Sequence, residues 1–263
     1  MIIAKAMAVL RKDMLTAIRY RNGFVFGVVA PALQFATFYY LSRAVGPQFR
    51  PEGMPYFSFL IVGTGFYTFL LAGIHSFLRT VQESQQTGTL EVLMTTATSP
   101  ATLLSLSALS AFASGIVQLL LYFCAGVLIF GVPHVNVIGC LSVFLFSVLI
   151  SAAIGLFAAG LQIAIHKGSA VLWLLGSTAW LMAGTMFPVA ALPARLRIVS
   201  GLMPFTHSLT AMRLALFQSA NSQALIREIG ILALFLLVLM PASVIFFSQM
   251  VRRARQFGTL SFY

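Results

Sequence analysis

The sequence has very few charged side chains. Only 8% of its 263 residues are charged, whereas 60% are hydrophobic, and an average soluble domain carries about 25% charged residues. So few charges cannot cover a surface that faces water, which argues against a soluble domain. The cysteines, Cys124 and Cys140, lie inside apolar stretches, where we expect small buried hydrophobic side chains and no disulfide.

Groups for nucleotide, proton or metal chemistry are also scarce. The lysines are Lys5, Lys12 and Lys167, and none precedes Ser or Thr, so no GxxxxGK[ST] phosphate-binding loop exists. The 5 acidic residues all fall in or beside predicted loops, whereas an ion-coupled carrier places ionisable groups at mid-membrane depth. The 4 histidines show no HExxH or His–Cys spacing of the kind that binds zinc. We therefore predict no catalytic residues, no metal site and no cofactor bound by this chain.

The sequence instead contains long runs of residues without any charged side chain. They cover residues 22–42, 53–78, 92–166, 168–194 and 229–251. A hydrocarbon core of ~30 Å needs ~20 apolar helical residues to cross it, so most runs fit one crossing and the longest fits two. Backbone groups in lipid must be paired within their own segment. The sequence therefore predicts an all-α membrane protein, a single domain over residues 1–263 with six transmembrane helices, near residues 24–41, 56–78, 101–130, 137–165, 169–187 and 229–250.

The net charge of +11 raises the question of a nucleic-acid partner. The basic residues bracket the predicted spans and do not line one face, and an excess of Lys and Arg on the cytoplasmic side accounts for such a pattern. The basic residues near both ends of the chain favour cytoplasmic termini. We predict a multi-pass protein in a lipid bilayer, with both termini in the cytoplasm and no nucleic-acid partner.

Segments outside the spans have distinct patterns. Residues 1–20 carry apolar and basic side chains on opposite sides at helical spacing, which predicts an amphipathic interfacial helix or, alternatively, a cytoplasmic extension of the first span. Residues 79–100 form the most polar internal segment and predict a short cytoplasmic helix between spans two and three. Residues 188–216 are interrupted by proline and arginine yet remain apolar, which predicts a broken, re-entrant outer hairpin between spans five and six.

Aromatic residues are concentrated in the first two spans. Aromatic faces suit an amphipathic or sugar-bearing cargo, although lipid contacts and helix packing explain the same residues. The candidate residues of a cargo path are Phe35, Phe38, Tyr39, Phe66 and Tyr67.

Three stretches resemble the type-2 ABC exporter permeases. Residues 83–100 are similar to the family signature "E…GTLE…L…SP", and residues 184–213 to its "G..FP...LP…L.P.T…R" stretch. The tail 255–263 is similar to the common C-terminus of the family. The sequence departs from the family at Gln85-Gln86, where charged residues often precede the glycine, and at His207, where many relatives have an aromatic residue. We expect the first departure to weaken polar contacts to a motor subunit and the second to touch no core element.

The resemblance implies the membrane half of a bacterial exporter in the plasma (inner) membrane, of the kind that exports drugs, nodulation factors or polysaccharides. A second permease copy and a separate ATP-binding-cassette ATPase subunit, which holds ATP and Mg, would complete the transporter. Residues implied in coupling to the ATPase are Glu83, Gly88, Thr89, Leu90, Glu91, Ser99 and Pro100. Residues implied in the outer hairpin are Phe187, Pro188, Leu192, Pro193, Pro204 and Arg213.

Arg213 raises a specific question, because a buried guanidinium needs an acid or a cluster of carbonyl groups. Glu52 and Glu228 are the acids predicted on the outer side. Several cargoes stay open, namely a drug, a lipid, a glycolipid or a polysaccharide, and so does the choice between a homodimer and a heterodimer. An ion-gradient-driven secondary carrier and a non-transporting membrane protein are the alternative functions.

Overall fold

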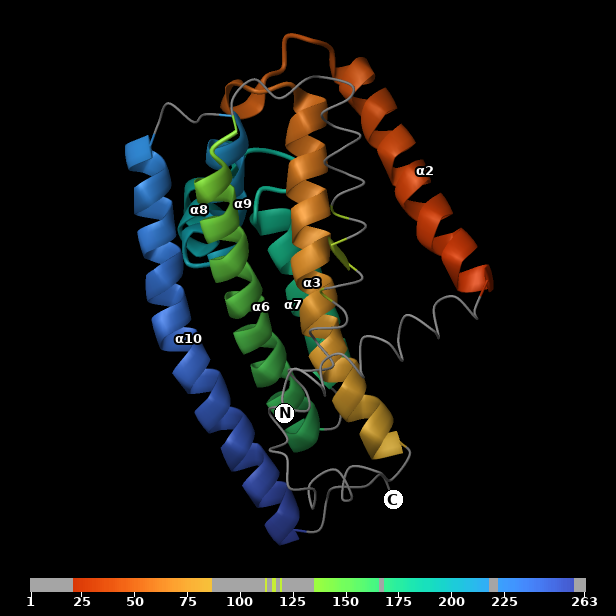
Figure 1. Ribbon diagram of the computed structural model, residues 1–263, viewed down its shortest axis with the longest axis vertical. Helices are drawn as coiled ribbons and strands as arrows, with labels where there is room; N and C mark the ends of the chain where they lie inside the picture. Colours follow the sequence, from red (N-terminus) through yellow and green to blue (C-terminus); the bar gives the residue numbers. More distant parts are fainter. Residues whose placement is uncertain are drawn as a thin grey trace.

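The computed structural model describes residues 21–86, 112, 115–116, 119, 135–165, 168–217 and 222–257. These residues form seven α-helices and two short 3-10 helices, without a strand among them, so the all-α prediction is confirmed for this part of the chain. The elements are α2 (Arg21–Val45), η1 (Pro51–Gly53), α3 (Tyr56–Gln86), α6 (Val137–Ile165), α7 (Gly168–Met182), η2 (Val189–Ala191), α8 (Ala194–Gly201), α9 (Pro204–Phe217) and α10 (Ser222–Phe257) (Figure 1).

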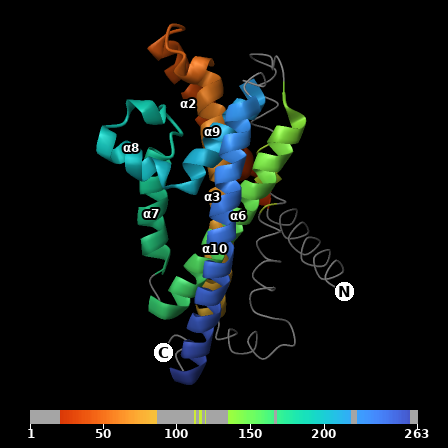
Figure 2. The same ribbon diagram turned by 90° about the vertical axis from the view of Figure 1, so that its left-hand side faces the viewer.

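Three of the described helices, α3, α6 and α10, are long and apolar enough to cross a membrane. They coincide with the second, fourth and sixth predicted spans, and all three run in the same direction (Figure 1). Between α6 and α10 the chain returns through α7, with α8 above it (Figure 2). The predicted third span, 101–130, lies outside the described residues apart from Phe112, Gly115, Ile116 and Leu119. The count of six spans therefore stays a prediction.

Several predicted boundaries differ from the observed ones. The sequence predicts that the second span ends at Leu78, but α3 continues to Gln86. The extension contains no Gly or Pro, and Arg79 pairs with Glu83 one turn later at 2.6 Å, an arrangement that supports a helix. Residues 79–86 are thus part of α3 and not of a separate helix, while 87–100 lie outside the described residues, as does the predicted helix 1–20.

The other spans also differ in length from the predictions. The 25 residues of α2 contain the predicted first span, and α10 extends the sixth at both ends, with 36 residues. In contrast, α7 ends at Met182 after 15 residues, which gives a rise of only ~22 Å. The chain turns at Gly184, where φ is 77°, a left-handed conformation that glycine adopts without steric cost.

Each proline in the outer segment (residues 188–216) that follows this turn starts a new element. Pro188 is the N-cap of η2, Pro193 is the N-cap of α8 and Pro204 is the first residue of α9. Proline suits these positions because its φ angle is preset and its missing N–H would have no helical partner there. The predicted interruption is present, and the depth of the segment in a membrane stays a prediction.

Helix α6 lies between α3 and α10 (Figure 1), and small residues allow both neighbours to approach closely. A Cβ on Gly155 would lie 2.5 Å from the Phe77 ring, and one on Gly160 would lie 3.2 Å from the Cα of Phe247. The hydroxyl of Ser151 donates to the carbonyl oxygen of Leu70 at 2.6 Å. Helix α6 is therefore the element that joins the two other long helices.

Large apolar side chains of α6 and α10 remain exposed on the outside of this bundle. Large exposed apolar side chains that gather on one surface mark a contact with a membrane or a partner, and those of α6 and α10 belong to helices of spanning length. The exposed residues include Ile138, Leu141, Leu145, Leu234, Leu237, Val238, Val244 and Ile245.

The close crossing at Gly155 gives a first prediction. Gly155→Ala should destabilise the protein by about 2 kcal/mol, because the added methyl group overlaps the Phe77 ring and overpacking costs about 1–3 kcal/mol. The measurement is the midpoint of SDS-induced unfolding of the detergent-solubilised protein. Gly230→Ala is the matched control, since a Cβ there meets nothing within 4 Å. Equal midpoints for the two variants would contradict the observed packing.

Candidate functional site

Arg213 of α9 joins several elements at the end of the bundle where α3 begins and α7 ends. Its side chain is only 2% exposed. Nη2 donates to the carbonyl oxygens of Gly184 at 2.8 Å, Phe59 at 3.3 Å and Thr185 at 3.5 Å. The guanidinium lies 3.5 Å from the centre of the Phe59 ring, and Nη1 lies 3.8 Å from Oε1 of Glu52. A guanidinium is always charged in proteins, and here both kinds of compensation expected for a buried charge, carbonyl groups and an acid, are present.

The backbone around Arg213 is adapted to this charge at three places. A Cβ on Gly63 would lie 2.4 Å from Nη2 of Arg213 and 2.6 Å from the carbonyl oxygen of Thr185, so only glycine fits there without displacement. Gly184 has a left-handed backbone, and so has Glu52, with φ of 55°. This conformation is costly for a residue with a side chain. Arg213 therefore joins α9, α3, the turn after α7 and the loop before α3.

The other residues implied in the outer hairpin differ in exposure. Leu192 is buried, Phe187, Pro188 and Pro204 are half-buried, and Pro193 is exposed. The hydroxyl of Ser200 ties the end of α8 to the end of α7, because it donates to the carbonyl oxygen of Met182 at 2.7 Å. Sequence reasoning did not single out Ser200, and its burial within an otherwise exposed helix carries no sequence signal.

The expectation that His207 touches no core element is wrong. Its Nδ1 lies 2.7 Å from Oε2 of Glu228 in α10, and its Nε2 lies 2.8 Å from the carbonyl oxygen of Gly201. Its ring centre also lies 5.8 Å from that of Phe235. The imidazole thus connects the end of α8 and helix α9 to α10, a role that an apolar ring could not fill.

The protonation of His207 follows from this geometry. A carbonyl oxygen only accepts hydrogen bonds, so Nε2 carries a proton, and an ionised Glu228 favours a second proton on Nδ1. The hydrogen bond to Glu228 raises the pKa of His207, with a smaller contribution from the Gly201 carbonyl, while burial and Arg227 act in the opposite direction.

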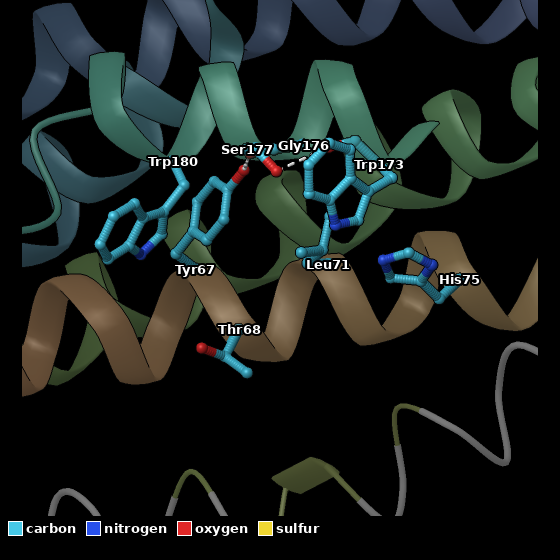
Figure 3. Close-up of a pocket in the computed structure, with 8 residues that line it drawn as sticks. All are labelled: Tyr67, Thr68, Leu71, His75, Trp173, Gly176, Ser177 and Trp180. Carbon is cyan, nitrogen blue, oxygen red and sulfur yellow. Dashed lines mark hydrogen bonds between the residues drawn. The ribbon is translucent and has the colours of Figure 1, made fainter. Parts of the chain in front are cut away.

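A groove lies between α3 and α7 (Figure 3). Its volume is about 480 Å³, within the range of ligand pockets of about 300–1,000 Å³. At its floor the hydroxyl of Tyr67 donates to the carbonyl oxygen of Gly176 at 2.7 Å, while the rim residue Trp173 is 70% exposed. The lining residues are Tyr67, Thr68, Leu71 and His75 of α3 and Trp173, Gly176, Ser177 and Trp180 of α7.

The residues proposed from the sequence for a cargo path are not gathered at one place. Phe35, Phe38 and Tyr39 of α2 pack against the start of α3 in a small separate cluster. Phe66 is fully buried in the main core, and Tyr67 alone among them lines the groove. Sequence reasoning missed Trp173 and Trp180, although their spacing of seven residues places both indoles on one face of a helix.

The inner end of the bundle, which we define as the ends of α3 and α6 near Gln86 and Ile165, contains a buried amide pair. Nε2 of Gln162 donates to Oε1 of Gln85 at 3.1 Å, and both residues are 1% exposed. Nε2 of Gln85 has no hydrogen-bond partner among the described residues. Glu83, in contrast, is exposed and pairs with Arg79. The other residues implied in coupling, Gly88, Thr89, Leu90, Glu91, Ser99 and Pro100, lie outside the described residues.

Within the described part of the chain, no group of three or more His, Cys, Asp or Glu side chains could hold a metal ion.

Residues 35–245 match the family model described as "ABC-2 family transporter protein", a match that runs from α2 into α10 and includes both the Arg213 anchor and the groove. The chain belongs to the ABC-2 transporter family. The resemblance seen in its motifs is thereby confirmed, and the protein is a membrane component of a transporter. No curated protein matches the chain.

The Arg213 anchor of this ABC-2 permease gives the second prediction. Arg213→Met should lower the free energy of unfolding by about 3 kcal/mol, because the carbonyl groups of Gly184 and Phe59 lose their donor in a buried place. Gly63→Ala should cost about 2 kcal/mol through overlap with Nη2. The added methyl group has more room when methionine replaces the guanidinium, so the double variant should be less destabilised than the sum of the single changes. SDS unfolding midpoints of the three variants test this, and strict additivity would contradict the contact.

The third prediction concerns the dependence of permease stability on pH. Because the pKa of His207 is raised, its pairing should contribute fully below the ordinary histidine pKa of about 6.5. The contribution should be lost as the pH rises through the raised value. Glu228→Gln should therefore reduce the change in thermal unfolding midpoint between about pH 6 and pH 8.5, and His207→Gln should do the same. A further reduction in the double variant would show that the two residues act separately.

Proposed function

We propose that this permease is the membrane subunit of an ATP-driven exporter, in which a separate ATP-binding-cassette subunit supplies the energy. Two permease copies of six spans each would form the pathway in a bacterial plasma membrane, with both termini in the cytoplasm. The cargo would be amphipathic. Closure of two ATPase subunits would push the segment that follows α3 and change which side of the membrane the pathway faces.

The observation that carries this proposal is the length of α3. Its 31 residues span ~46 Å, about 16 Å more than a hydrocarbon core of ~30 Å. The excess lies at the end that bears Arg79, Glu83 and Gln86 and leads into Gly88. A rigid helix that crosses the membrane and projects from it can transmit a force applied at its polar end to its buried face.

The contacts of α3 support a route for such a force through α6. Close to the polar end, Gln85 is bonded to Gln162 of α6, and farther along the helix Ser151 of α6 is bonded to Leu70. A shift of α3 along its axis would break both bonds unless α6 moved with it. Helix α10 packs on the opposite side of α6, so the three long helices are suited to move as one body.

The direction of the long helices supports the six-span topology. Since α3, α6 and α10 run the same way, the chain has to cross back once between each pair. Residues 87–134 are long enough for one return, and α7 with the turn at Gly184 supplies the other.

The fourth prediction tests the coupling segment. Glu91→Ala should leave expression and membrane insertion unchanged but reduce co-purification of the ATPase subunit, or lower export per ATP hydrolysed, because a charge-assisted contact is lost. Gln48→Ala is the matched control, since it removes an exposed polar side chain from the loop on the opposite side. Unchanged export by the Glu91 variant would remove this residue from the proposed coupling role.

A second measurement separates the exporter from a secondary carrier. Proteoliposomes that contain the permease alone should not transport in response to a proton or sodium gradient, and transport should require the ATPase subunit and ATP. Gradient-driven transport without that subunit would contradict the proposal.

A further inference from the structure

The polar groups of the groove are arranged to accept hydrogen bonds. The hydroxyl of Tyr67 donates to the carbonyl oxygen of Gly176 at 2.7 Å, that of Ser177 to Trp173 at 2.8 Å and that of Thr68 to Thr64 at 2.7 Å. Each hydroxyl has one hydrogen and two lone pairs, so the hydrogens are used within the protein. Tyr67 is only 2% exposed, and Thr68 points away from α7 in Figure 3, so the lone pairs that a ligand in the groove can reach are those of the exposed Ser177. His75 makes no hydrogen bond to another described residue, and a neutral imidazole adds one further lone pair.

The apolar part of the groove also presents negative electrostatic potential to a ligand. Trp173 and Trp180 stand two turns apart on α7, ~10.5 Å along the helix axis, and Figure 3 shows their indoles on the side of α7 that faces α3. The face of an aromatic ring carries negative electrostatic potential and attracts cations. No lining residue is charged. The charged residues on the next turns of α3, Arg79 and Glu83, form an ion pair at 2.6 Å and compensate each other.

We propose that this groove binds a planar aromatic cation, an organic ammonium compound whose ring stacks on the face of one indole while its positive group lies beside the Ser177 hydroxyl and the His75 imidazole. This inference rests on the proposed export function and names the class of cargo for it. The volume of about 480 Å³ fits one drug-sized molecule. A lipid acyl chain would leave the lone pairs without a donor, and an anion would face oxygen atoms and ring faces of its own sign.

The chain provides its own probe for this site. It contains 2 tryptophans, and both line the groove, so intrinsic tryptophan emission reports on the groove alone. The full-length permease in phosphatidylcholine nanodiscs would be titrated with pyrenylmethylammonium, whose protonated amine carries N–H donors, and, separately, with pyrenesulfonate, which shares its ring system and differs in charge. We expect saturable quenching of tryptophan emission by the cation, with an affinity at least about tenfold higher than for the sulfonate.

Substitutions of groove residues test whether the cation binds in the groove. Ser177→Ala should weaken cation binding about threefold to tenfold, as expected for the loss of one hydrogen-bond acceptor. Trp173→Phe and Trp180→Phe each leave one fluorophore, and its emission should still be quenched. Ser142→Ala is the matched control, because Ser142 of α6 also donates to the carbonyl four residues earlier, at 2.9 Å, but lies outside the groove. Its titration should equal that of the wild type.

Four results would overturn the proposal. Equal quenching by both pyrenes would mean simple partition into lipid, and preference for the sulfonate would mean an anion site. If brominated acyl chains quench the emission and the cation does not relieve that quenching, lipid occupies the groove. If the emission changes only with the number of permease copies in each nanodisc, a second copy occupies the groove. The titration needs neither ATP nor the ATPase subunit, so its failure is distinguishable from failure of the Glu91 experiment.

Discussion

The buried guanidinium of Arg213 requires compensation, and the end of the bundle where α3 begins and α7 ends is organised around that requirement. Moving such a charge out of water costs several kcal/mol even after relaxation, so the surrounding elements must supply carbonyl groups and an acid at fixed positions. The carbonyl groups come from α3 and from the turn after α7, and the acid comes from the loop before α3. The left-handed backbone of Glu52 and the missing side chain of Gly63 are consequences of the same requirement.

Below this anchor the long helices are joined by close contacts of α6. Gly155 and Gly160 allow α3 and α10 to approach it from two sides, and buried polar bonds fix the register with α3. Helix α7 is different, because it is short and leaves a groove beside α3. The bundle therefore combines a rigid part, formed by the three parallel helices, with a less covered side at which aromatic residues are accessible.

The sequence predicted the membrane class, the helical content and the interruption of residues 188–216 by proline correctly, because each depends on local patterns. Charge-free runs located α3, α6 and α10, and Pro188, Pro193 and Pro204 marked the starts of elements in the outer segment. Helix ends were less predictable, since polar residues such as Arg79 and Glu83 extend α3 without interrupting it. The pairing of His207 with Glu228 and the convergence of Tyr67 with Trp180 depend on contacts between distant segments, and a single sequence carries no direct signal for these.

The common direction of α3, α6 and α10 has an electrostatic consequence. Peptide dipoles add along each helix to about half a positive charge at the N-terminus and half a negative charge at the C-terminus. Parallel helices cannot cancel one another, so their three macrodipoles place negative partial charge together at the end where Gln86, Ile165 and Phe257 lie. Arg252 and Arg253 in the last turns of α10 counter that accumulated field, so these two cations stabilise the helix bundle.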